Sequence, residues 1–359
     1  HPSNCFQPEA AQQLLAECKV SSIVLPRKMA GGLGSAIDTG ETSAAYSHSE
    51  GLLGGHTLEI DKNQYTTLST ALTTLVSAME IEELFQVFAQ SFIRFEKDLL
   101  DVAFENTYAN RETLNDDVFF SSIRHRFNVN IITILTSYKS YDDHCNRILV
   151  SSITPPDAKE FNCLTRSKTF DAHLSYRICA QLRDYAQHRA LPLGGFSIGS
   201  KANFGRDSSG NIIKLDSGFN VSPWLNVLKF KSSSQCKAPL CKELERLDYE
   251  KIDMKWLIRS FAGAMYGRHA ALRTFLKPEI IAAGEKITAG YDLASATKNS
   301  EAKFLELYGN GERRPMRNDL GAKVLRAFET YASLSRAENS HVTSQIIPEH
   351  VTYSGKDDA

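Results

Sequence analysis

Apolar residues recur at helical spacing along most of the chain, and this periodicity limits the possible folds more than any other feature of the sequence. In residues 81–99 the apolar positions form a wide stripe, so a helix there needs packing partners on several sides. Helical patterns of this kind cover residues 68–79, 81–99, 117–149, 169–189, 253–275, 278–293 and 320–334. The chain is therefore predicted to be mainly helical, with its helices packed as a bundle.

The pattern changes between residues 194 and 231. Two short apolar segments, 196–198 and 211–215, flank the turn-rich segment 206–210. Apolar segments on either side of a Gly- and Asp-containing turn are typical of a β-hairpin. The predicted fold is thus mainly α, a helical bundle with a small β-hairpin insertion.

Three regions are expected along the chain. Residues 1–55 contain a Gly- and Ser-rich stretch and are expected to be an N-terminal extension that is largely loop. Residues 56–290 are expected to form the helical domain, with the hairpin inserted at about 194–231. Residues 291–359 are expected to hold C-terminal helices and a polar tail.

The charge and composition of the chain limit its partners. With 41 basic and 42 acidic side chains the net charge is −1, so a nucleic-acid site has to be a local patch. The apolar runs are too short to span a bilayer, and no membrane association is expected. The seven scattered cysteines favour a reducing cytoplasm over a disulfide framework.

Three residues with suggestive chemistry, Arg183, Asp184 and His188, lie near the end of the helix expected over 169–189, which Pro192 should terminate. An arginine offers a fixed fork of donors to phosphate oxygens, and a histidine titrates near neutral pH. These two groups can cleave RNA without a metal. The histidine activates the ribose 2′-OH, while the arginine stabilises the charge that develops on the phosphorane.

The sequence Arg183-Asp184-x-x-x-His188 resembles the signature of the HEPN superfamily, in which an arginine is followed a few residues later by a histidine and often directly by Asn, Asp or His. The resemblance implies a helical bundle that acts as a metal-independent endoribonuclease of a toxin or phage-defence system. It implies that His188 is a general acid or base, that Arg183 stabilises the phosphate, and that Asp184 orients the pair.

The resemblance also implies partners. They are an RNA substrate, a second copy of the chain in a homodimer, and a cognate antitoxin or other regulatory protein, with no cofactor and no metal. Basic residues near the motif in the sequence are expected to bind the RNA backbone; they are Arg177, Arg189 and Lys201. The same residues also fit the ordinary scatter of charge on a solvated surface.

The spacing of the motif sets a geometric condition. Arg183 and His188 are five residues apart, which places them about 140° apart around a straight helix. They can converge if the helix loosens at its C-terminal end, or if two protomers each contribute a set. The alternative without catalysis is that Asp184 and His188 form an ordinary surface pair, four residues apart, near the helix C-terminus.

Two other functions stay open. A non-catalytic helical module that binds a protein or a nucleotide fits the same scaffold. A serine hydrolase would use Ser197, within the Gly-x-Ser-x-Gly sequence of residues 195–199, but a nucleophile elbow lies between a strand and a helix, and here a helix comes before it. Cys236 and Cys241 have no second pair of ligands at zinc spacing, so no metal site is expected.

Overall fold

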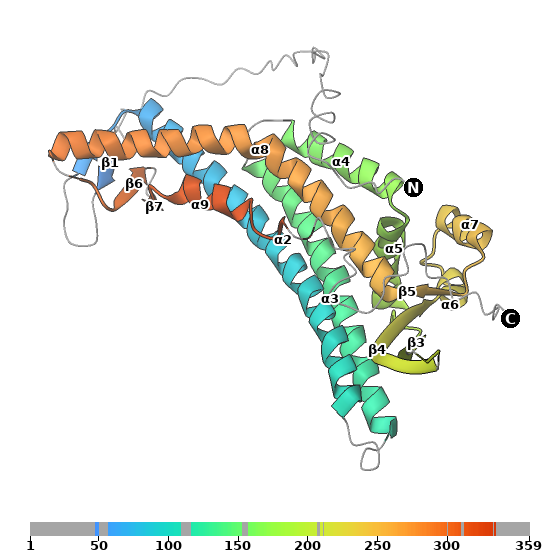
Figure 1. The fold of residues 1–359 in the computed structure, drawn as a ribbon. Helices are drawn as coiled ribbons and strands as arrows, with labels where there is room; N and C mark the ends of the chain where they lie inside the picture. The colour runs from blue at the N-terminus through green and yellow to red at the C-terminus, as the bar shows by residue number, and fades with distance from the viewer. Residues whose placement is uncertain are drawn as a thin grey trace. The chain divides into compact units, whose positions relative to one another are not determined.

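The chain is mainly helical, as predicted, with short antiparallel strands (Figure 1). The structure is a computed structural model, and it describes residues 47–49, 57–108, 116–152, 157–206, 209–210, 212–299, 301–309, 312–332 and 334. Most of the expected N-terminal extension and of the polar tail lie outside these residues. No helix in the described part is both long and apolar enough to cross a membrane.

The described residues fall into two compact units that do not follow the order of the chain. Unit 1 draws on the ranges 1–79, 151–158 and 273–328, and unit 2 on the ranges 80–150, 159–272 and 329–359. Two long helices each contribute to both units. These helices are α2, Lys62–Tyr108, and α8, Met254–Lys298.

Unit 1 contains a four-stranded antiparallel sheet with the strand order β2-β1-β6-β7. The Tyr291 hydroxyl of α8 donates a hydrogen bond to the Met316 carbonyl at the end of β7, at 2.7 Å. A helix after the sheet, α9, packs so closely against α8 that a Cβ atom on Gly321 would lie 3.0 Å from the Cα atom of Gly284. The elements are β1 Ser47–Ser49, β2 Thr57–Glu59, β6 Leu305–Gly309, β7 Glu312–Met316 and α9 Leu320–Ala327.

Unit 2 is a helical bundle with an aromatic core. The second half of α2 packs along α3, where the centroids of the Phe95 and Phe127 rings lie 6.3 Å apart. The first half of α8 joins them through Phe261, whose ring meets the Phe88 ring edge-on at 5.8 Å. The helices that complete the unit are α3 Asp116–Ser151, α4 Ala158–Ala172, α5 Leu174–His188, α6 Val227–Lys231 and α7 Ala238–Leu247.

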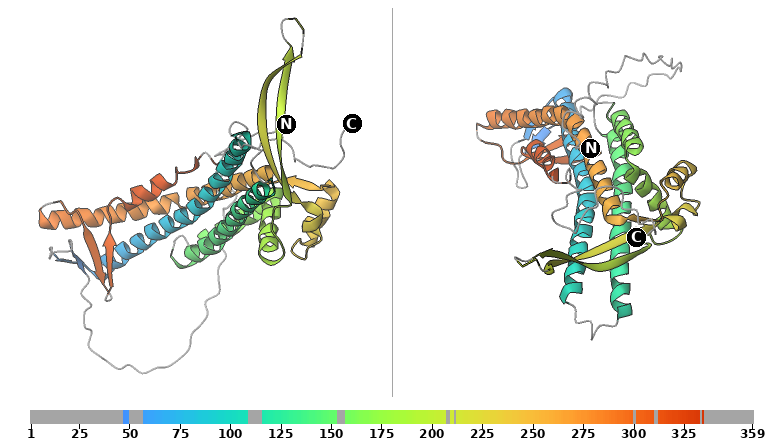
Figure 2. Two further views of the ribbon diagram at one scale, coloured as in Figure 1. Left: turned by 90° about the horizontal axis from the view of Figure 1, so that it is seen from below. Right: turned by 45° about the vertical axis from the view of Figure 1, so that its right-hand side comes forward.

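The predicted hairpin is confirmed and is longer than the sequence indicated. Strands β3, Gly195–Arg206, and β4, Ile212–Asn226, form a long twisted ribbon that extends beyond the helices of unit 2 in the left view of Figure 2. At its base β4 also pairs with β5, Lys251–Asp253. The base of the hairpin requires a glycine at position 195, because a Cβ atom on Gly195 would lie 1.7 Å from the Trp224 ring.

Several predicted helix boundaries are corrected. The segments 68–79 and 81–99 belong to the single helix α2, and 253–275 and 278–293 belong to the single helix α8. Pro278 lies inside α8 and is exposed, so burial of the neighbouring turns outweighs its missing hydrogen bond. The last predicted helix, 320–334, ends as α9 at Ala327.

The helix that carries the motif is shorter than predicted at its start. Thr169 belongs to α4, and His173 separates α4 from α5, whose first residue is Leu174. The predicted end is confirmed, since α5 stops at His188. Asp253 caps α8 as predicted, because its Oδ1 accepts a hydrogen bond from the Lys255 backbone N–H at 2.6 Å.

Candidate functional site

The C-terminal end of α5 holds the three motif residues on a firmly anchored helix. The buried face of α5 fixes its rotation and includes Tyr176, Ile178, Cys179, Leu182 and Tyr185. At the end of the helix the Tyr185 carbonyl accepts two hydrogen bonds, from the N–H groups of Arg189 at 2.9 Å and Ala190 at 3.2 Å. Because the Ala190 bond spans one residue more than an α-helical bond, the last turn is wider than a regular one.

The chain leaving α5 is held in turn by α3. The Leu193 backbone N–H donates to the side-chain oxygen of the buried Asn128 at 3.1 Å. The six residues between His188 and β3 are thus tied at both ends, which fixes the motif relative to the base of the hairpin.

The structure brings two of the three motif residues together. Arg183 and Asp184 form an ion pair, with Arg183 NH1 at 2.9 Å from Asp184 Oδ1. Their side chains are 23% and 42% exposed, so both face solvent in part. Arg183 Nε is buried and has no hydrogen-bond partner among the described residues.

His188 stands apart from this pair. It is the last residue of α5 and is exposed. Within the described part of the chain it makes no ion pair with Asp184, so the surface pair considered as an alternative is not formed. The imidazole is therefore open to a ligand, but α5 alone does not bring it to Arg183.

Arg177, expected to bind RNA, is instead committed to the fold. Its Nε and NH2 groups contact the Glu243 carboxylate of α7 at 3.2 and 2.7 Å. Its NH1 group donates to the carbonyls of Phe170 and Asp171 at 2.9 and 2.6 Å. A guanidinium with these partners, and only 18% exposed, is not free for a phosphate.

The other two residues expected to bind RNA are Arg189 and Lys201. Arg189 is exposed and donates one hydrogen bond, from NH2 to the Ser234 hydroxyl at 2.8 Å, which leaves other donors of its guanidinium available. Lys201 belongs to β3, and its side chain lies outside what the structure describes.

Arg177, Gln181, Asp184 and His188 follow one another at helical spacing along α5 and form a polar stripe with two parts. Towards the N-terminus it faces α7: Arg177 binds Glu243, and the buried Gln181 accepts a hydrogen bond from the Lys237 backbone N–H at 2.6 Å. Towards the C-terminus, Asp184 and His188 face solvent. Only the second part can meet a substrate.

A buried cluster of charged residues in the core of unit 2 was not predicted from the sequence. Arg268 is fully buried, and its NH2 group lies 2.7 Å from Asp142 Oδ1. The same guanidinium donates to the Tyr176 hydroxyl at 2.9 Å and to the Asn162 side-chain oxygen at 3.0 Å. Asp142 also accepts from Arg166 at 3.0 Å. These contacts join α3, α4, α5 and α8.

A second buried group adjoins this cluster. His269 is stacked on the Phe85 ring at 3.9 Å, its Nδ1 lies 2.9 Å from the Tyr141 hydroxyl, and its Nε2 lies 3.0 Å from Glu82 Oε1. Burial raises the pKa of Tyr141 and raises the pKa of the nearby Cys145 thiol to about 12. His269, Glu82 and Tyr141 are all buried in the core of unit 2, so their contacts with one another support the fold.

One signal in the sequence could have located the cluster. Arg268 and His269 occupy core positions of the apolar pattern that runs from Met265 to Leu272 in α8. Charged residues at core positions are rarely buried unless they are paired. The pattern therefore predicts that Arg268 and His269 have buried polar partners, but it does not identify those partners.

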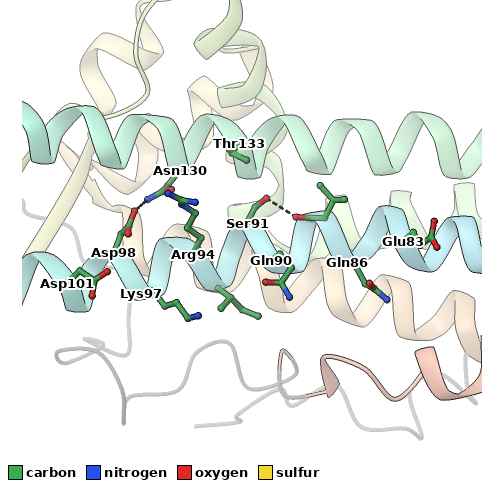
Figure 3. A pocket seen from close by; sticks show the side chains of 12 residues that line it. Glu83, Gln86, Gln90, Ser91, Arg94, Lys97, Asp98, Asp101, Asn130 and Thr133 are labelled. Atoms are coloured by element: carbon green, nitrogen blue, oxygen red, sulfur yellow. Dashed lines mark hydrogen bonds between the residues drawn. The ribbon is translucent and has the colours of Figure 1, made fainter.

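An open groove of about 830 Å³ lies between α2 and α3 in unit 2 (Figure 3). Its lining mixes charges of both signs, with Arg94 and Lys97 near Asp98 and Asp101 on α2. Asp98 accepts a hydrogen bond from Asn130 of α3. The groove contains none of the three motif residues and is a separate surface.

Ser197 lacks the setting of a hydrolase nucleophile. It lies inside β3, directly opposite Ser222 of β4, and not at a turn from a strand into a helix. The strained geometry of a nucleophile elbow is therefore not formed. In the part of the chain that is described, no three His, Cys, Asp or Glu side chains are grouped so that they could hold a metal ion.

No protein-family model, no curated protein and no solved structure matches the chain.

Proposed function

We propose that the chain is a metal-independent, HEPN-like endoribonuclease of a toxin or phage-defence system that acts in the cytoplasm. The observation that carries the proposal is the end of α5, where an exposed His188 follows the ion-paired Arg183 and Asp184 on a widened last turn. The mainly helical fold is compatible with the HEPN resemblance.

The chemistry assigns one step to each residue. His188 removes the proton of a ribose 2′-OH, and the 2′-oxygen attacks the adjacent phosphorus. Arg183 stabilises the negative charge on the phosphorane, and Asp184 holds the guanidinium in place through their 2.9 Å contact. The bond from phosphorus to the 5′-oxygen then breaks, and this oxygen takes up a proton. The products are a 2′,3′-cyclic phosphate and a free 5′-hydroxyl.

The pair must converge for this reaction to occur. Tyr185 accepts two hydrogen bonds at the end of α5, so the backbone beyond His188 already departs from a regular helix. A homodimer is the second route, in which the Arg183 of one protomer meets the His188 of its partner. Arg189 is exposed beside the motif and would bind the RNA backbone, whereas four of the five N–H donors of Arg177 already bind groups of the fold. A cognate antitoxin or regulatory protein would cover the same surface.

A second candidate function is a non-catalytic module that binds a protein or a nucleotide. The groove between α2 and α3 favours it, because a volume of about 830 Å³ lined by both charge signs is large enough for a nucleotide. Chemical-shift or crosslink mapping separates the two candidates. Ligand contacts confined to the groove support the module, and RNA contacts at Arg183 and His188 support the nuclease.

The proposed reaction is tested by incubating the full chain with end-labelled RNA in excess EDTA. The RNA is expected to be cut to products that end in a 2′,3′-cyclic phosphate. A matched oligonucleotide with 2′-deoxyribose at the cut position is expected to stay intact, because it lacks the attacking oxygen. Cleavage of the deoxy substrate at the same rate would overturn the mechanism.

A further inference from the structure

The N-terminus of α7 is held in an unusual way. Its N-cap residue, Lys237, provides no side-chain hydrogen bond, and the first turn contains no acidic residue. Cys236 and Cys241 occupy the positions just before the cap and four residues into the helix, which in many helices hold an apolar pair that fixes the entry of the chain. In α7 that pair is made of two thiols.

The two cysteines are in contact. The Cys241 thiol donates to the Cys236 carbonyl oxygen, with 3.2 Å between sulfur and oxygen. Both are free thiols; Cys236 is buried and Cys241 is half-buried. The contact joins residues five positions apart in the chain and lies wholly within unit 2.

We propose that Cys236 and Cys241 are an oxidation site, which a hydroperoxide converts into an intrachain disulfide. The more accessible Cys241 thiolate attacks the peroxide, the O–O bond breaks, and a sulfenic acid forms with release of water or an alcohol. The Cys236 thiolate then attacks the sulfenic sulfur, the S–O bond breaks, and the S–S bond forms with release of water. Two thiols are oxidised and one peroxide is reduced.

Residues beside the two cysteines form hydrogen bonds with α5 and with the residue that follows it. Lys237, between the two cysteines, donates its backbone N–H to Gln181 of α5 at 2.6 Å, and the Ser234 hydroxyl accepts from Arg189 at 2.8 Å. Fixing the entry of α7 by a covalent bond therefore acts on residues that hold the end of α5. This consequence rests on the proposed nuclease function, whereas the disulfide itself does not.

The second step is expected to be the slower one. Burial, followed by the hydrogen bond with Cys241, raises the pKa of Cys236 to about 12. A raised thiol pKa reduces the thiolate at neutral pH, and the thiolate is the attacking species. Raising the pH towards this pKa restores it, so ring closure should become about tenfold faster per pH unit between about pH 7 and 9.

Trypsin offers a direct readout, because it cleaves after Lys237 and so separates the peptides 232–237 and 238–242, which carry one cysteine each. The full chain is treated with hydrogen peroxide, alkylated and digested with trypsin, and the masses of its peptides are measured by mass spectrometry. The expected product is the two peptides joined, with a mass two hydrogens below their sum, and formed faster at higher pH. Cys236→Ser and Cys241→Ser should each abolish it.

Cys163, a half-buried cysteine on α4, is the internal control for access of the oxidant. If Cys163 is oxidised while peptides 232–237 and 238–242 remain unlinked over the same pH range, the proposal is overturned. RNA cleavage by the oxidised and reduced chain is measured separately. A linked peptide without any effect on cleavage keeps the oxidation site and removes only its link to α5.

Discussion

Replacement of Asp142 by alanine is expected to lower the free energy of unfolding by about 3–5 kcal/mol. Asp142 is the carboxylate that faces Arg268, whose side chain is fully buried, at 2.7 Å. Without it the guanidinium stays in the core of unit 2 as an uncompensated charge, and Arg166 also loses its partner. The loss is measured from urea unfolding curves of the wild-type and variant proteins.

The neighbouring residue provides a matched control. Asp143 forms an ion pair with Lys139 at 2.6 Å, but its side chain is 56% exposed. Asp143→Ala should therefore cost only about 0.3–0.5 kcal/mol, as usual for an exposed pair one helical turn apart. Equal losses for Asp142→Ala and Asp143→Ala would contradict a structural role for the buried cluster.

Replacement of His188 by alanine is expected to slow RNA cleavage by about 10²–10⁴-fold, the usual contribution of a general acid or base. The stability of the protein should not change, because His188 is exposed and ends its helix. Initial rates are measured in EDTA with enzyme in excess over labelled RNA, and unfolding curves are recorded in parallel.

Gln187, the exposed residue directly before His188, is the control for this substitution. Gln187→Ala should keep the wild-type rate, because an amide cannot exchange a proton in the reaction. A His188→Ala protein that cleaves as fast as Gln187→Ala would remove the histidine from the mechanism.

The helices and the hairpin could be predicted because their signals are local. A helix is encoded by apolar residues three and four positions apart, and α3 matches its predicted range almost throughout. The turn between β3 and β4 is encoded in the same way, within a few residues. Strand β6 has no such signal, since one of its partners is β1, more than 250 residues earlier in the chain.

The difference between local signals and long-range contacts also separates what the sequence predicted near the α5 motif from what it did not predict. The position of Arg183, Asp184 and His188 at the end of a helix follows from the apolar pattern and Pro192. The role of Arg177 does not, because Glu243, its partner, is 66 residues away in sequence. Contacts of this kind depend on tertiary packing, which a single sequence does not reveal.

If Arg183 and His188 belong to one catalytic site, the double variant Arg183→Ala/His188→Ala should show it in its rate of RNA cleavage. Residues that act as a unit in one transition state give losses that do not multiply. The double variant should therefore cleave RNA in EDTA about as slowly as the slower single variant. Losses that multiply, or three variants that cleave as fast as the wild type, would contradict a shared site at the end of α5.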